Sequence, residues 1–259
     1  MKAFLWLFLF IFHNLFAQES VVLKELFDKY SVQGTMIFQS LDGQKEYMFN
    51  EQRANQPLLP ASTFKIPNTL IALDTNLIEN ENSIIVWDKQ EREITQWNQD
   101  QTLKSAFQNS CVWCYQYFAM QLSIEQYKSY LKILHYGNEE VGERLTSFWL
   151  DGQLRITPYQ QIAFLKKLHN NQLPFKIEHL EILKSIMLEK ENENYTLRAK
   201  TGWSKSEVPN HGWYVGYVQT KEDVWFFATN IITKSAQDLP KRKYITMQAL
   251  KNLGILPKD

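Results

Sequence analysis

The sequence predicts an α+β fold, with one antiparallel β-sheet assembled from both ends of the chain and a mostly helical lobe inserted between them. Strand patterns occur in two groups, one near each end of the chain, at 34–40, 45–50, 195–200, 212–219 and 224–232. Between the groups, roughly over 63–190, apolar residues recur at helical spacing. Terminal strands separated by a run of helices indicate α+β architecture, with a cleft where the lobe meets the sheet.

The individual elements follow from local patterns. A first helix is expected over 20–30, and the turn residues Leu41-Asp42-Gly43 join the first two strands. Within the lobe, a spacing near 3.6 residues predicts helices over 64–73, 112–122, 124–134, 158–169 and 178–188. A last helix over 240–253 follows the final strand, so terminal helices flank the predicted sheet.

Composition excludes several classes of function. The chain has 259 residues, 44% of them hydrophobic, which is enough for one large domain. Basic and acidic residues number 28 each, so the formal net charge is zero. Because nucleic-acid-binding proteins normally carry a basic face, no nucleic acid partner is expected.

The first seventeen residues differ from the rest. Lys2 precedes an apolar run from Ala3 to Phe12, and Ala17 stands before a polar residue. This pattern is typical of a secretory signal peptide and is too short to span a membrane comfortably. We therefore expect cleavage near Ala17, a single domain over 18–259, and a periplasmic or secreted mature protein that is not bound to a membrane.

The first chemical motif is Pro60-Ala61-Ser62-Thr63-Phe64-Lys65. Ser62 suits a helix N-cap, and a helix that begins there would place Lys65 one turn away on the same face. A serine hydroxyl is a weak nucleophile until a base takes its proton, and a desolvated lysine can serve as that base. Taken alone, this motif also fits a capped helix followed by a solvated lysine.

Two further motifs change that interpretation. Lys200-Thr201-Gly202 lies on a predicted strand about 135 residues after Lys65, and Ser110 follows Ser62 by forty-eight residues. A strand lysine and threonine can bind a carboxylate, and glycine lets a ligand approach the backbone. An S-x-x-K motif at a helix start, followed by K-T-G on a strand, is the signature of penicillin-recognising serine enzymes.

The sequence resembles one family of these enzymes, the class D or OXA-type serine β-lactamases. The resemblance extends from about residue 20 to the C-terminus, in the family's order and spacing. Besides the motifs above, it rests on Ser110-Cys111-Val112, Tyr136-Gly137-Asn138, Phe148-Trp149-Leu150, Gly152-Gln153-Leu154-Arg155-Ile156, Gly212-Trp213-Tyr214-Val215-Gly216 and Leu239-Pro240-Lys241-Arg242-Lys243. It implies the penicillin-binding protein and serine β-lactamase fold.

The resemblance implies a catalytic role for five residues. Ser62 would form the acyl-enzyme, and Lys65 would be N-carboxylated by carbon dioxide to give the general base. Trp149 would hydrogen-bond this carbamate through its indole N–H. Ser110 and Lys200 would carry the proton that passes to the leaving nitrogen.

The resemblance also implies a substrate-binding set. Val112 and Leu150 would form apolar walls, and Thr201 and Arg242 would hold the substrate carboxylate. The glycine of the K-T-G motif, Gly202, belongs to the same surface. The backbone N–H groups of Ser62 and Trp203 would form the oxyanion hole.

The implied function is hydrolysis of the β-lactam amide bond of penicillin-type antibiotics, which confers antibiotic resistance. The partner would be a small-molecule β-lactam. No metal and no dissociable cofactor are expected, apart from the carbon dioxide or bicarbonate that carboxylates Lys65. The sequence leaves a monomer and a homodimer open, and it does not rank penicillins, cephalosporins and carbapenems.

Two alternatives remain at this point. A non-hydrolytic transpeptidase, carboxypeptidase or sensor-like domain would share the serine, lysine and K-T-G motifs but not efficient deacylation. A thiol–disulfide protein would instead use Cys111 and Cys114, which are spaced C-x-x-C. That pair has no role implied by the resemblance. It fits either a disulfide that tightens the loop carrying Ser110 or two small buried residues.

Overall fold

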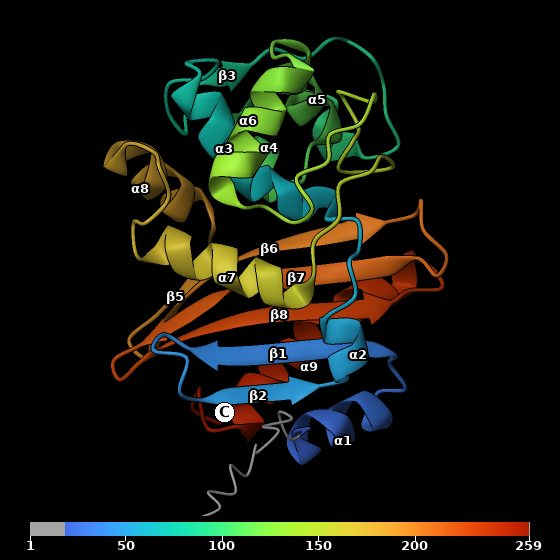
Figure 1. Ribbon diagram of the computed structural model, residues 1–259, viewed down its shortest axis with the longest axis vertical. Helices are drawn as coiled ribbons and strands as arrows, with labels where there is room; N and C mark the ends of the chain where they lie inside the picture. The colour runs from blue at the N-terminus through green and yellow to red at the C-terminus, as the bar shows by residue number, and fades with distance from the viewer. Residues whose placement is uncertain (1–18, 259) are drawn as a thin grey trace, which may run out of the picture.

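The computed structural model describes residues 19–258, so the predicted signal peptide lies outside the described residues. Figure 1 shows a twisted six-stranded antiparallel sheet with strand order β2-β1-β8-β7-β6-β5. Its strands are β1 (Gly34–Ser40), β2 (Glu46–Phe49), β5 (Leu188–Glu191), β6 (Tyr195–Ser204), β7 (His211–Thr220) and β8 (Val224–Ile232). Both ends of the chain therefore contribute to one sheet, and the predicted fold class is confirmed.

Helices cover both faces of this sheet (Figure 1). The first and last helices, α1 (Val21–Lys29) and α9 (Leu239–Asn252), pack on each other, and α9 packs on β7 and β8. The opposite face is covered by α7 (Pro158–His169), which contacts β8, β7 and β1. The remaining helices are α2 (Glu51–Ala54), α3 (Lys65–Asp74), α4 (Leu103–Gln108), α5 (Val112–Met120), α6 (Ile124–Leu134) and α8 (Ile177–Ile186).

The sheet separates two hydrophobic cores because alternate residues of a strand point to opposite faces. In β1, Met36 and Phe38 join the core under α1 and α9, whereas Ile37 joins the core that continues into the helical lobe. Residues 211–218 of β7 are all buried. A strand that is covered on both faces reads as a continuous apolar run. The buried centre of the sheet gives the site a rigid support.

The predicted elements match the structure closely, with three differences. The strand predicted over 195–200 extends to Ser204, through the K-T-G motif. Short elements escaped the periodicity analysis, because a few residues cannot establish a period. These are α2, α4, β5 and the two-stranded pair β3 (Ile84–Ile85) and β4 (Gln101–Thr102). The third difference is that α7, which lies within the interval predicted as the helical lobe, packs on the sheet.

No helix among residues 19–258 combines the length and hydrophobicity that a membrane span requires. The longest helix in this part of the chain, α9, has 14 residues and carries several charges. A membrane-spanning helix needs about 20 apolar residues.

The start of α7 is fixed by a capping box. The Thr157 hydroxyl accepts a hydrogen bond from the Gln160 backbone N–H at 3.1 Å, and the Gln160 side chain accepts one from the Thr157 backbone N–H at 2.9 Å. Pro158 occupies the first helical turn, where its missing N–H costs nothing. This reciprocal cap sets where the helix that covers the sheet begins.

We expect Thr157→Ala to lower the free energy of unfolding by about 1 kcal/mol, because it leaves the Gln160 N–H without its side-chain acceptor. Urea denaturation followed by circular dichroism measures this change. Thr157→Ser keeps a hydroxyl and should retain most of the stability. Equal stability of the alanine variant and the wild type would contradict the proposed contribution of the cap.

Candidate active site

The S-x-x-K motif lies where the chain passes from the sheet into the helical lobe. Residues Ala61–Phe64 form a 3₁₀ turn that leads directly into α3 at Lys65. The prediction that Ser62 is the N-cap of the helix is therefore wrong, because the chain tightens for one turn before the α-helix begins. Ser62 and Lys65 still lie one turn apart, and the Lys65 ammonium donates to the Ser62 hydroxyl at 3.2 Å.

Lys65 lies in an apolar and aromatic pocket. Its side chain is 1% exposed, and its Nζ lies 4.8 Å from the centre of the Tyr115 ring. Burial disfavours the charged amine and lowers the Lys65 pKa to about 7. Trp149 is fully buried and stacks on Phe64, the residue before Lys65, with ring centres 5.5 Å apart. Near neutral pH a large share of Lys65 is thus a free amine.

A second serine–lysine pair faces the first. Ser110 precedes α5 in the left-handed backbone region, with φ of 53°, and its hydroxyl accepts a hydrogen bond from the Lys200 ammonium. Lys200 also donates to the Thr201 carbonyl at 3.1 Å. Burial holds the Lys200 pKa well below its ordinary value, and the positive charges of Lys65 and Arg242 lower it further. Lys200 can therefore exchange a proton with Ser110 more readily than an exposed lysine.

The K-T-G strand lies directly against the nucleophile turn. A Cβ added to Gly202 would lie 3.3 Å from the Ser62 backbone nitrogen and 3.1 Å from the Pro60 carbonyl oxygen. A larger side chain there would push the strand away from the serine. Arg242 on α9 donates to the Gly202 carbonyl at 3.1 Å, and its burial lowers its pKa to about 10. Arg242, predicted from the sequence to bind the substrate carboxylate, therefore contacts the K-T-G strand.

An open cavity of about 540 Å³ lies between the lobe and the sheet. All six of the predicted substrate-binding residues line it, and several rim residues were not predicted. The lining consists of Ser62, Ile94, Trp97, Gln108, Asn109, Ser110, Val112, Leu150, Thr201, Gly202, Trp203, Lys205, Ser206, Leu239 and Arg242. Three of the predicted catalytic residues, Lys65, Lys200 and Trp149, are buried and do not line this cavity.

Sequence reasoning missed the aromatic rings that face the two lysines. Tyr115 lies against Lys65, and Phe107 lies 5.5 Å from the Lys200 Nζ. The Tyr115 hydroxyl shares a hydrogen bond of 2.7 Å with Thr69, which fixes its ring. A signal for Tyr115 exists, since it stands one helical turn after Val112 on the same face of α5. The rim residues Ile94 and Trp97 carry no such signal, because the 3₁₀ turn that holds them is too short to show a period.

The two cysteines form a disulfide. Cys111 and Cys114 are bonded to each other and are both fully buried at the start of α5. Cys111 directly follows Ser110, so the bridge ties the serine loop to the first turn of the helix that carries Tyr115. Within residues 19–258, no group of three or more histidine, cysteine, aspartate or glutamate residues is arranged to hold a metal ion.

Comparisons with known proteins agree with this geometry. A sequence profile of the penicillin binding protein transpeptidase domain matches residues 30–251. The chain is 41% identical to β-lactamase OXA-48 of Klebsiella pneumoniae over 231 residues, which are 89% of this chain and 87% of that protein. It is 40% identical to β-lactamase OXA-20 of Pseudomonas aeruginosa over 236 residues, which are 90% and 87% of the two proteins. The crystal structure of the class D β-lactamase YbXI from Nostoc superposes with a TM-score of 0.88 at 41% identity, covering 90% of this chain and 98% of that one.

The fold and the paired serine–lysine site thus define a penicillin-recognising serine enzyme. The chain belongs to the class D β-lactamases, the OXA-type family that its motifs resemble. The similar proteins are named β-lactamases, so the comparisons do not favour the transpeptidase or sensor alternative.

We expect the double variant Cys111→Ala, Cys114→Ala to keep β-lactam hydrolysis, because neither sulfur lines the cavity. Its free energy of unfolding should fall by about 2 kcal/mol, the amount that a chain-entropy estimate gives for so short a loop. Thermal unfolding and a hydrolysis assay measure the two effects.

Alkylation of the unfolded wild type, with and without reductant, supplies the control for this variant. It should detect two thiols only after reduction. Loss of hydrolysis in a folded double variant would contradict the structural role of the bridge and revive the thiol–disulfide alternative.

Proposed function

We propose that the protein hydrolyses the amide bond of β-lactam antibiotics through an acyl-enzyme on Ser62, with an N-carboxylated Lys65 as general base. The observation that carries this proposal is the burial of the Lys65 amine 3.2 Å from a serine hydroxyl that opens on a cavity. Such a serine has a base at hydrogen-bond distance and room for a small substrate. Opposite it, Ser110 and Lys200 supply a second proton carrier.

The surroundings of Lys65 support its carboxylation. Only a neutral amine attacks carbon dioxide, and burial brings the Lys65 pKa to about 7. The segment with Trp149 and Leu150 is tied to the turn that carries Ser62, because the Trp149 carbonyl accepts a hydrogen bond from the Ala61 N–H at 2.9 Å. The Trp149 indole N–H would hydrogen-bond the carbamate. When present, the carbamate would supply a carboxylate-type base for the Ser62 hydroxyl and for the deacylating water.

The chain's own residues account for the other requirements of the reaction. As the bond from Ser62 Oγ to the carbonyl carbon forms and the ring C–N bond breaks, the leaving nitrogen needs a proton. Ser110, hydrogen-bonded to Lys200, is placed to deliver it. Water then replaces Ser62 on the acyl carbon and restores the hydroxyl.

Substrate orientation follows from the charges at the far side of the cavity. Arg242 and Thr201 both line it, and Arg242 is fixed by its bond to the Gly202 carbonyl. An arginine can make a two-pronged contact with the carboxylate of a β-lactam. The backbone N–H groups of Ser62 and Trp203 would bind the oxyanion. Trp203 is itself held by a 3.2 Å hydrogen bond from its indole to Thr233.

An exported location supports the same function, since β-lactam targets lie outside the cytoplasm. The N-terminal signal-peptide pattern favours export. The Cys111–Cys114 disulfide fits an oxidising compartment.

We expect Ser62→Ala to abolish acylation, because no other hydroxyl takes the place of the nucleophile. Hydrolysis should fall by a factor on the order of 10³ or more, and mass spectrometry should detect no penicilloyl adduct. Ser185→Ala, on the exposed face of α8, is the matched control and should behave like the wild type. An adduct on the Ser62→Ala protein would reject the assignment of the nucleophile.

We expect removal of carbon dioxide at a pH below 7 to inactivate the enzyme, because Lys65 is then mostly protonated and cannot re-form the carbamate. Bicarbonate at a pH above 7 should restore activity, and labelling with ¹³C-bicarbonate should give one carbamate signal. Lys65→Ala should lack the signal, and Trp149→Phe, which keeps the ring but not the N–H, should weaken it and slow deacylation. A degassed enzyme of unchanged activity would reject the carbamate.

A further inference from the structure

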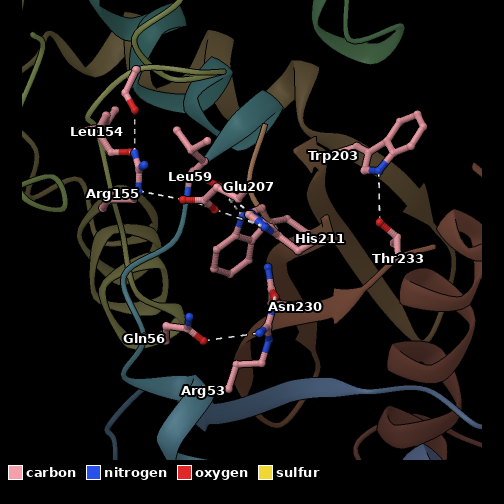
Figure 2. A network of polar contacts seen from close by, with 12 residues as sticks. Arg53, Gln56, Leu59, Leu154, Arg155, Trp203, Glu207, His211, Asn230 and Thr233 are labelled. Atoms are coloured by element: carbon pink, nitrogen blue, oxygen red, sulfur yellow. Dashed lines mark hydrogen bonds and ion pairs between the residues drawn. The ribbon is translucent and has the colours of Figure 1, made fainter. Parts of the chain in front are cut away.

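The backbone of Leu59, three residues before the nucleophile, is held at both its N–H and its carbonyl by side chains from the β6–β7 loop and from β7 (Figure 2). Its N–H donates to Glu207 Oε2 at 3.1 Å. Its carbonyl accepts from His211 Nε2 at 3.0 Å and from Trp213 Nε1 at 2.8 Å. A loop peptide with three side-chain partners is unusually constrained, since most loop peptides rely on water or on neighbouring backbone.

The same network reaches a third segment. Glu207 Oε1 forms an ion pair of 2.8 Å with Arg155 Nε, and Arg155 donates in turn to the carbonyls of Gly152 and Leu154. Figure 2 shows the chain of contacts from Leu154 through Arg155 and Glu207 to His211. The network therefore joins the residues before Ser62, the β6–β7 loop, and the segment that follows Trp149 and Leu150.

The conformation of Ala61, one of the two residues between Leu59 and Ser62, explains why this backbone needs to be held. Ala61 has φ of 48°, in the left-handed region that alanine disfavours by roughly 1–2 kcal/mol. A strained residue keeps its conformation only when its surroundings fix both sides. The Ala61 N–H is held by the Trp149 carbonyl at 2.9 Å, and the Leu59 peptide is held by Glu207 and His211.

We propose that Glu207, His211 and Arg155 are positioning residues, which hold the Leu59 peptide and so keep Ala61 and Ser62 in the conformation that acylation requires. This inference rests on the proposed acyl-enzyme function. None of the three side chains lines the cavity, so they act through the backbone rather than on the substrate. A displacement of about 1 Å at a reacting group can cost about a hundredfold in rate.

His211 gives this network a pH-dependent member. The Leu59 carbonyl can only accept, so Nε2 carries a proton, and Nδ1 faces the Glu207 carboxylate at 3.4 Å. The charged groups around the ring are Glu207 in the β6–β7 loop, Arg155 in the segment after Trp149, and Arg53 on α2. Burial lowers the His211 pKa, and the two arginines add to this effect, while the Leu59 carbonyl and Glu207 oppose it. His211 is therefore mainly neutral at pH 7.

The first arm of the test measures acylation. We compare the wild type with Glu207→Gln, His211→Leu and His211→Gln in single-turnover experiments with a chromogenic cephalosporin. Glu207→Gln and His211→Leu should slow acylation about tenfold in protein that is folded at the assay temperature. The change should lie in the maximal acylation rate and not in the substrate concentration that gives half of this rate. His211→Gln retains a donor at the end of its side chain and should restore most of the rate. Glu222→Gln, the same exchange in the exposed β7–β8 turn, should have no effect.

The second arm follows unfolding against pH. The folded-state His211 pKa lies below the unfolded value of about 6.5, so the unfolded chain takes up this proton first as the pH falls. This increment of stability is complete above pH 6.5 and is lost as the pH falls towards the lower folded-state pKa. The melting temperature of His211→Gln should lack this loss, because glutamine does not titrate, whereas parallel curves would show that folding does not lower the His211 pKa.

Two outcomes would reject the proposal. Wild-type acylation rates in folded Glu207→Gln and His211→Leu would show that the network does not position Ser62. Slow acylation by His211→Gln equal to that of His211→Leu would show that the hydrogen bond to Leu59 is not the cause. Failure of the wild type itself to form an acyl-enzyme would instead reject the proposed function, and the positioning role with it.

Discussion

A lysine amine without access to water, one turn from a serine, is the constraint on which the rest of the site depends. Burial of Lys65 is costly, because an ammonium loses its hydration and gains no carboxylate in return. The chain meets this cost by lowering the pKa of the amine rather than by pairing it. The surroundings of the amine are consistent with this, since the Tyr115 ring lies against it and no acidic side chain in the described part of the chain contributes to its pKa.

This constraint explains why the site lies between the lobe and the sheet. The helical lobe supplies the apolar surroundings of Lys65, and strand β6 of the sheet supplies Lys200 and the glycine that lets the strand approach the serine. Neither part contains both lysines, so the relative position of the two parts determines the distance between the base and the proton carrier. The contacts that link the segments on either side of the site, such as Trp149 with Ala61 and Glu207 with Leu59, therefore help to set this distance.

The sequence predicted the fold class, most of the helices and the central residues of the site, because these depend on local periodicity and on motifs of fixed spacing. Ser62 with Lys65 is a one-turn relationship, and Lys200 lies in a strong strand pattern. It could not predict that α7 covers the sheet, since an amphipathic pattern does not say which surface it meets. The sequence also did not predict the hydrogen bonds to the Leu59 backbone. A backbone group has no signature in the sequence, and its side-chain partners lie about 150 residues away.

The electrostatics of the cavity link substrate binding to proton transfer. Lys200 lies near Lys65 and Arg242, and these charges add to burial in lowering its pKa. A neutral Lys200 cannot donate a proton to the leaving nitrogen through Ser110. An anionic group bound beside Arg242 would offset these positive charges and raise the Lys200 pKa, because an opposite charge nearby favours the protonated amine. A substrate carboxylate would then both fix the orientation of the ring and charge the proton donor, so a β-lactam that lacks this carboxylate should lose rate as well as affinity.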